Sequence, residues 1–206
     1  IRIAKAIERW SDDAVVINAL GIKPGKSLDV DGVNAALMRL SALECFGLIT
    51  DRFERHGGQG ILFVETPDAA GGKSSLEVGV SFTDDLKGDV TYGVTLRHRR
   101  LALNGLGGEW QNVVTLGDSY GAATELYQPL EATMRWFALA GAVTGRTQQR
   151  LWVDGETVAE YEFRRARVGA ALGRVLGNWG DASLWTYSAR HEGERRIGTS
   201  LIPEFR

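Results

Sequence analysis

Apolar and polar residues alternate along most of the chain from Lys73 onward. A period of two residues puts every second side chain on the same face of an extended strand, so the pattern predicts β-strands with one apolar face. Turn signals rich in Gly, Asn and Asp separate the segments. The pattern predicts seven strands, the two flanking Asp154-Gly155 being the longest: 76–82, 90–96, 110–117, 121–127, 133–153, a segment from that turn to Gly173, and 181–191.

The chain before about residue 67 has a mixed pattern. Ile1, Ile3 and Ile7 suit a first strand, and Ser11 offers an N-cap for a short helix that ends at Gly21. Helical spacing of apolar residues then predicts a second helix, and two strand-like segments follow around a Gly-rich hairpin: Val30, Val33, Leu37 and Leu40 on the helix, then 46–53 and 61–66. The predicted order is strand, helix, helix, strand, strand.

The alternation assigns residues of the second region to opposite faces of a sheet. The apolar face carries Leu76, Val78, Val80, Val90, Tyr92, Val94 and Leu96. The polar face carries Glu77, Asp89, Arg97, Glu109, Glu125, Arg165 and Arg167. The apolar positions change parity between Tyr161-Phe163 and Ala166-Val168, which predicts a β-bulge near Arg164.

Alternating strands of this kind occur both in soluble β-sandwiches or ligand-binding barrels and in membrane β-barrels. The aromatic residues gathered in the second region are typical of a membrane-interface girdle. Single-chain bacterial outer-membrane barrels have even strand numbers, so seven strands would be only part of such a barrel. The chain contains no run of 18 apolar residues and no signal-peptide pattern.

Composition narrows the function classes. The 206 residues carry a formal net charge of −2, which offers no basic surface for nucleic acid. The single cysteine, Cys45, excludes an internal disulfide and a Cys-based zinc site, and we interpret it as a small packed residue.

One motif suggests catalysis. The segment Gly117–Gly121 matches G-x-S-x-G, the nucleophile elbow of serine hydrolases, with Ser119 as nucleophile and Asp154 or Asp181 and His191 as partners. No alternating strand and helix pattern surrounds it, so a hairpin turn between two strands is the favoured interpretation. The basic run 97–100 is typical of a solvated strand end, and Gly105–Gly108 of a turn. We therefore assign no catalytic residue and no cofactor or metal ligand.

Two groups of segments resemble known families. Gly21–Asp29, the following helix to Leu43, and Phe46 resemble a POTRA domain, a small β-α-α-β-β module found before outer-membrane barrels. Three later segments are similar to the C-terminal half of bacterial patatin-like phospholipases, which are type Vd autotransporters: 103–110, 124–130 and 159–180. Those proteins join a patatin domain, one POTRA domain and a barrel of the outer-membrane assembly-factor superfamily.

The resemblance implies a mainly β fold, with a periplasmic POTRA domain over residues 1–70 and about seven of 16 barrel strands over 71–206, within the known range of strand numbers. It also implies an outer-membrane location and contact with lipid and with the outer-membrane assembly machinery. The patatin catalytic segments would lie upstream of Ile1 and the closing strands beyond Arg206. The expected role is to anchor or deliver a lipolytic domain. If the module binds a passenger chain, the expected mode is strand addition to a sheet edge; the alternative is a module that only spaces the passenger from the barrel.

Three alternatives remain open from the residues. The same architecture would serve a general outer-membrane insertase or a two-partner secretion pore. A soluble serine hydrolase using Ser119 and a soluble β-rich binding protein are the other two.

Overall fold

A computed structural model describes residues 2–4, 13–20, 30–41, 44, 46–57, 59–67, 72–84, 90–153 and 156–198. Its first part is an α+β module with the predicted order of elements: β1 (Arg2–Ala4), α1 (Asp13–Leu20), α2 (Val30–Ser41), β2 (Thr50–His56) and β3 (Gln59–Glu65). The expected strand from Phe46 begins at Thr50 instead, and the expected N-cap Ser11 and stop Gly21 lie outside the described residues.

The module is built from a three-stranded sheet covered by two helices. The strand order is β1-β3-β2, with β1 parallel and β2 antiparallel to β3. The apolar stripe of α2 faces α1 and one side of β3 because its residues recur at helical spacing. The buried cluster that results is Val16, Ala19, Leu20, Val33, Ala36, Leu40, Leu62 and Val64.

The second part is an antiparallel sheet whose strands follow chain order, β10-β9-β8-β7-β6-β5-β4. Their bounds are β4 (Ser74–Asp84), β5 (Val90–Arg100), β6 (Glu109–Gly117), β7 (Tyr120–Pro129), β8 (Trp136–Val153), β9 (Glu156–Val175) and β10 (Asp181–Gly198). The prediction of seven strands is confirmed for the described residues. A short 3-10 turn, η1 (Gly177–Trp179), joins β9 to β10.

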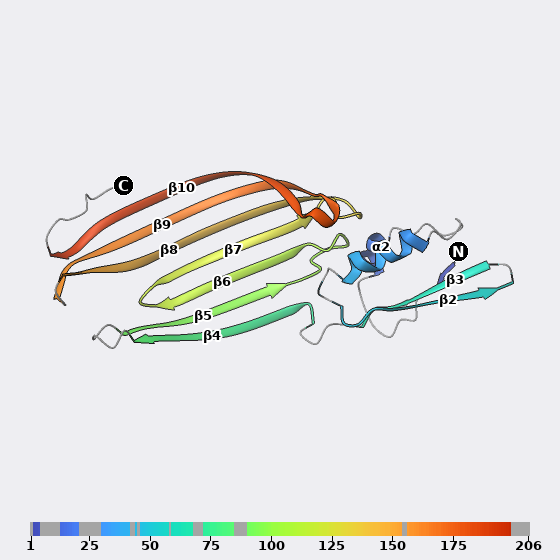
Figure 1. Ribbon diagram of the computed structural model, residues 1–206, viewed down its shortest axis with the longest axis horizontal. Helices are drawn as coiled ribbons and strands as arrows, with labels where there is room; N and C mark the ends of the chain where they lie inside the picture. The colour runs from blue at the N-terminus through green and yellow to red at the C-terminus, as the bar shows by residue number, and fades with distance from the viewer. Residues whose placement is uncertain are drawn as a thin grey trace.

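The sheet curves but does not close. Among the described residues, β4 and β10 each pair on one side only, so the sheet is an incomplete barrel. Figure 1 shows the module at one end of the strands and the tips of the β6–β7 and β8–β9 hairpins at the opposite end. We call these the module end and the tip end. Strands β8, β9 and β10 have 18, 20 and 18 residues and reach furthest toward the tip end, so the expectation that the two strands flanking Asp154-Gly155 are the longest holds for β9, whereas β8 is only as long as β10.

Glycines on one face of the sheet allow this curvature. A Cβ at Gly173 would overlap the ring of Phe137 on the neighbouring strand, and one at Gly169 would collide with Tyr187. Glycine in a strand interior commonly marks such a close approach or bend. At Gly173 the Phe137 ring therefore fills the space that the missing side chain leaves.

The predicted bulge near Arg164 is wrong. Pairing runs without interruption through Arg164 on both neighbouring strands, and the register shifts lie instead at Leu151/Trp152 and Arg195/Ile197. Tyr161 and Phe163 therefore share a face with Arg165. The sequence pattern failed because it assumed that aromatic residues point to the apolar face, whereas Tyr161 is fully buried on the opposite face near the tip end.

Candidate functional site: the two faces of the sheet

The strand register places the predicted residues on two opposite faces. Up to the register shifts at Leu151/Trp152 and Arg195/Ile197, each pair of neighbouring strands aligns even-numbered residues with even-numbered ones and odd with odd. The predicted apolar set, from Leu76 to Leu96, lies together on the even-numbered face. The predicted polar set shares the odd-numbered face, except Asp89, which lies outside the described residues. We call these the apolar face and the polar face.

The apolar face has the height of a bilayer core. On β9, Arg164 and Arg174 bracket Ala166, Val168, Ala170 and Leu172 on this face. Ten residues of strand span about 34 Å at about 3.4 Å per residue. With the tilt of about 35–45° that barrel strands adopt, this length corresponds to a band about 25 Å tall, as in outer-membrane barrels.

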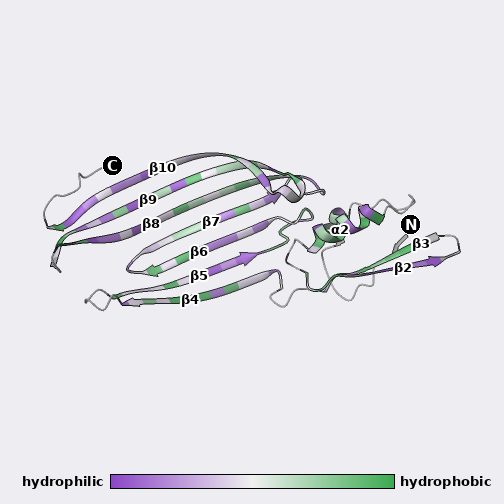
Figure 2. Ribbon diagram, viewed as in Figure 1, coloured by the Kyte–Doolittle hydropathy of each residue, from purple (hydrophilic) through white to green (hydrophobic). Residues whose placement is uncertain are grey.

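Amphipathic aromatic residues lie near both ends of this band. Toward the module end, Trp110 donates its indole N–H to Thr124 Oγ1 at 2.8 Å, and the Arg174 guanidinium lies 5.3 Å from the ring centre of Trp136. Toward the tip end, the Arg146 guanidinium lies 4.8 Å from the ring centre of Tyr120. Rings with a polar edge or a cationic neighbour suit the boundary between hydrocarbon and water. Hydrophilic residues gather at the tip ends of β8 and β10 in Figure 2.

The polar face carries charged side chains that pair with one another across strands. Arg97 Nη1 lies 3.5 Å from Glu77 Oε2, and Arg99 hydrogen-bonds to Glu109. A hollow of about 640 Å³ on this face is lined by charged residues, among them Glu125 and Arg165, and by apolar ones such as Val143. Such a face would border water rather than lipid if the barrel were complete.

The module contacts the module end of the sheet through groups that sequence reasoning missed. Asn18 Nδ2 donates to the carbonyl oxygen of Gly105 at 2.8 Å, and Arg99 Nη1 lies 2.7 Å from Glu44 Oε2. Met134, in the β7–β8 turn, packs against the buried cluster of the module. Burial, and to a smaller extent the charge of Arg135, lowers the pKa of Arg39 on α2. No local pattern marks these residues, because each partner lies in a distant segment.

Reversing the charge at Glu44 should loosen this docking. In the Glu44→Lys variant, an ammonium group faces the Arg99 guanidinium, and we expect the contact to weaken by about 1 kcal/mol. Hydrogen exchange at residues 101–108 of the intact protein should become faster. The Glu54→Lys variant is the control, since Glu54 pairs with Arg52 inside the module, at 3.3 Å. Equal acceleration in both variants would contradict docking through Glu44.

The proposed Ser119 catalytic triad is not assembled. Ser119 lies in the two-residue turn between β6 and β7, with no helix after it, so the G-x-S-x-G match is a hairpin. His191 lies three strands away on β10, about 14 Å at about 4.8 Å per strand. Asp181 lies at the opposite end of β10 from His191, and Asp154 is outside the described residues. Asp118 instead accepts the backbone N–H of Tyr92 at 2.7 Å and fixes the turn.

The other residues that the sequence singled out are the basic run 97–100, the Gly-rich segment 105–108 and Cys45. Alternation splits the basic run, so Arg97 and Arg99 lie on the polar face while His98 and Arg100 lie on the other. The segment 105–108 is a turn in which Asn104 Oδ1 accepts the backbone N–H of Leu106 at 3.0 Å. Cys45 lies outside the described residues, which contain no group of three metal-ligating side chains. No helix of the described part is long and apolar enough to cross a bilayer.

The chain matches no family model and no curated protein by sequence. Two solved structures are similar in fold. BamA from Haemophilus ducreyi lacking POTRA domains 1-3 matches 96% of the chain with a TM-score of 0.59 and 11% identity. CdiB from Acinetobacter baumannii matches 99% with a TM-score of 0.62 and 12% identity. The chain spans 36% and 39% of those two structures. The chain therefore has the fold of an incomplete β-barrel preceded by an α+β module.

Proposed function

We propose that this chain is part of an outer-membrane barrel that inserts or secretes proteins, with the module on the periplasmic side. The observation that carries the proposal is the two-faced sheet, with an apolar band about 25 Å tall bounded by aromatic and arginine side chains. In this proposal the apolar face contacts lipid, and the polar face borders the path of a client polypeptide.

The fold of the neighbours supports a protein-handling role over a purely passive anchor. BamA and CdiB share this arrangement of module and sheet over nearly the whole chain, although their identity is low. The contacts of Asn18 and Glu44 hold the module against the module end of the barrel. A chain delivered to the module would therefore arrive near the opening of the polar face.

The module offers an edge that suits capture of an extended chain. Among the described residues, β2 pairs with β3 alone, so its outer side presents backbone donors and acceptors. A client segment could add to this edge as a further strand, because backbone hydrogen bonds give affinity that tolerates many sequences. The exposed side chains of Arg52 and Glu54 keep this edge polar between clients.

A second candidate is the anchoring of a lipolytic domain, as the resemblance to patatin-like phospholipases implies. The three segments that carry it, 103–110, 124–130 and 159–180, all fall in or between the strands of the sheet. The resemblance concerns the barrel and its connections, so it leaves the nature of any attached domain to experiment.

Depletion of the intact protein in its own cells tests the proposal. An insertase predicts that many other barrel proteins decline in the outer membrane, whereas a secretion pore predicts loss of one secreted partner. A lipase anchor predicts loss of phospholipase activity, with the levels of other barrel proteins and of secreted partners unchanged. Recovery of the intact protein in the aqueous phase without detergent would contradict all three.

A further inference from the structure

The tip end of the apolar face holds a cluster of arginines around one buried carboxylate. Glu162 is 1% exposed, although it lies on the same face as Val168 and Leu172. Its Oε1 lies 2.7 Å from Arg164 Nη2, and its Oε2 lies 3.1 Å from Arg146 Nη1. Arg196 Nε lies 3.2 Å from the same Oε2. Three guanidinium groups from three neighbouring strands therefore share one carboxylate.

The three guanidinium groups carry more hydrogen-bond donors than the Glu162 carboxylate can accept. Each guanidinium carries five N–H groups, about 15 in total, whereas a carboxylate accepts about four hydrogen bonds. Nearby acids reduce the positive charge without removing it: Glu192 pairs with Arg190 at 2.6 Å, Glu160 pairs with Arg150 at 3.7 Å, and Glu194 lies on the same face. The residues named in this cluster are five arginines and four glutamates, so one positive charge remains: Arg146, Arg150, Arg164, Arg190 and Arg196 against Glu160, Glu162, Glu192 and Glu194.

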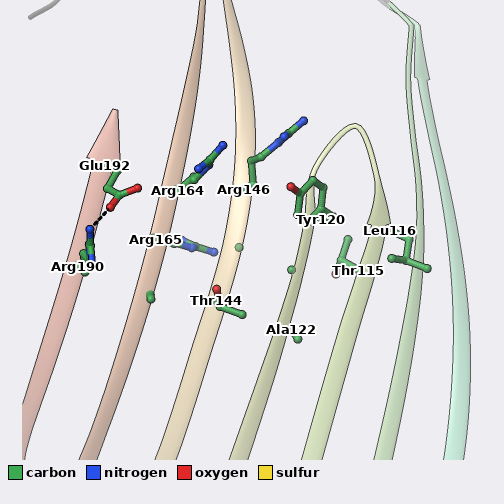
Figure 3. Close-up of a pocket in the computed structure, with 13 residues that line it drawn as sticks. Thr115, Leu116, Tyr120, Ala122, Thr144, Arg146, Arg164, Arg165, Arg190 and Glu192 are labelled. Atoms are coloured by element: carbon green, nitrogen blue, oxygen red, sulfur yellow. Dashed lines mark ion pairs between the residues drawn. The ribbon is translucent and has the colours of Figure 1, made fainter. Parts of the chain in front are cut away.

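A groove runs from the arginines into the apolar band. In the pocket in Figure 3, about 550 Å³, Arg146 and Arg164 lie toward the tip end, level with Leu116. Arg190 and Ala122 lie two residues further into the band. In Figure 3, Arg146 and Arg164 project in the same direction from neighbouring strands, beside Tyr120.

A second pocket continues this groove on the same face. It measures about 570 Å³ and shares Ala122, Thr144, Ala166 and Arg190 with the first pocket. Its other lining residues include Val114, Ala142 and Val168, with Asn112, Thr124 and Ser188 at its far end. The two pockets together form one groove that has the arginine cluster at one end and small apolar side chains along its length.

We propose that this groove binds one phosphorylated membrane lipid in the leaflet remote from the module, with its phosphate on the arginines and an acyl chain along the adjoining apolar part. Arginine suits phosphate because its planar fork makes paired, charge-assisted hydrogen bonds. The depth is consistent with this assignment, because Arg164 lies where the apolar band ends and headgroups begin. The inference rests on the proposed membrane-spanning role of the sheet.

Native mass spectrometry of the intact, detergent-purified protein tests the site with three probes: dimyristoyl phosphatidic acid, its phosphate-free diacylglycerol, and inorganic phosphate. We expect selective retention of phosphatidic acid, because only this probe has both the anion and the chain. In the Arg146→Gln/Arg164→Gln double variant, its affinity should fall about tenfold, as expected for lost charge-assisted hydrogen bonds. The Arg97→Gln variant is the control, because Arg97 lies on the polar face of β5, beside Glu77 and outside both pockets.

The Glu162→Gln variant distinguishes an arginine cluster that binds lipid from one that only stabilises the fold. Replacing the carboxylate with an amide releases guanidinium groups and removes one negative charge, so phosphatidic acid should bind more tightly in protein that keeps its folded gel mobility. Equal retention of diacylglycerol, equal loss in Arg97→Gln, or weaker binding in folded Glu162→Gln would overturn the inference. A separate experiment measures whether the intact protein floats with lipid vesicles. Failure to float contradicts the membrane-spanning role, whereas failed lipid selectivity in floating protein contradicts the lipid site alone.

Discussion

An arginine in place of Val168 should prevent stable insertion of the barrel. Val168 lies near the middle of the apolar band on β9, four residues from Arg164 and six from Arg174, and its side chain is 60% exposed. A cation on the lipid face near the bilayer midplane costs about 2–4 kcal/mol. We expect a lower folded fraction in lipid vesicles, measured by the heat-dependent shift in gel mobility of the intact protein.

The matched control introduces the same residue on the polar face. Ala123 is half-buried on β7 and has an odd number, so the Ala123→Arg side chain would point toward the polar face. Its folded fraction should remain close to that of the wild type. If both variants insert equally well, the assignment of the even-numbered face to lipid is wrong.

Truncation of Leu40 should destabilise the module by about 2–5 kcal/mol, the usual cost of a large-to-small change in a closed core. Leu40 is fully buried among residues of both helices and β3. Hydrogen exchange of α2 amides in the intact Leu40→Ala protein should accelerate correspondingly.

Met38→Ala provides the control for this variant. Met38 lies on the same helix but is 74% exposed, so its truncation should change exchange by only a few tenths of a kcal/mol. Equal acceleration in the two variants would show that the helix does not pack through the face assigned to it.

The strands were predictable because alternation is a local property. Leu76, Val78 and Val80 define one face of β4 by their spacing alone. The register between β4 and β5 then aligns this face with the apolar face of β5. The order of elements in the module followed from helical spacing in the same way. The prediction at Arg164 failed because Tyr161 is buried on the polar face, a fact that depends on neighbouring strands rather than on spacing.

The charged contacts were not predictable from the sequence. Glu162 meets Arg146 and Arg196, which lie on β8 and β10, only because the hairpin register brings these residues side by side. The docking of the module by Asn18 and Glu44 depends likewise on where the loops of the sheet end. A change of one residue in register would send each of these side chains to the other face.

By itself, the sequence determined seven two-faced strands and a module of strand, helix, helix, strand, strand, because backbone geometry repeats every two residues in a strand and every 3.6 in a helix. Only the tertiary structure decided that the strands form one curved, open sheet, that the hydrolase-like motif is a turn, and that three arginines gather around Glu162 at the edge of the apolar band. Those outcomes depend on pairing between distant segments, which periodicity does not encode.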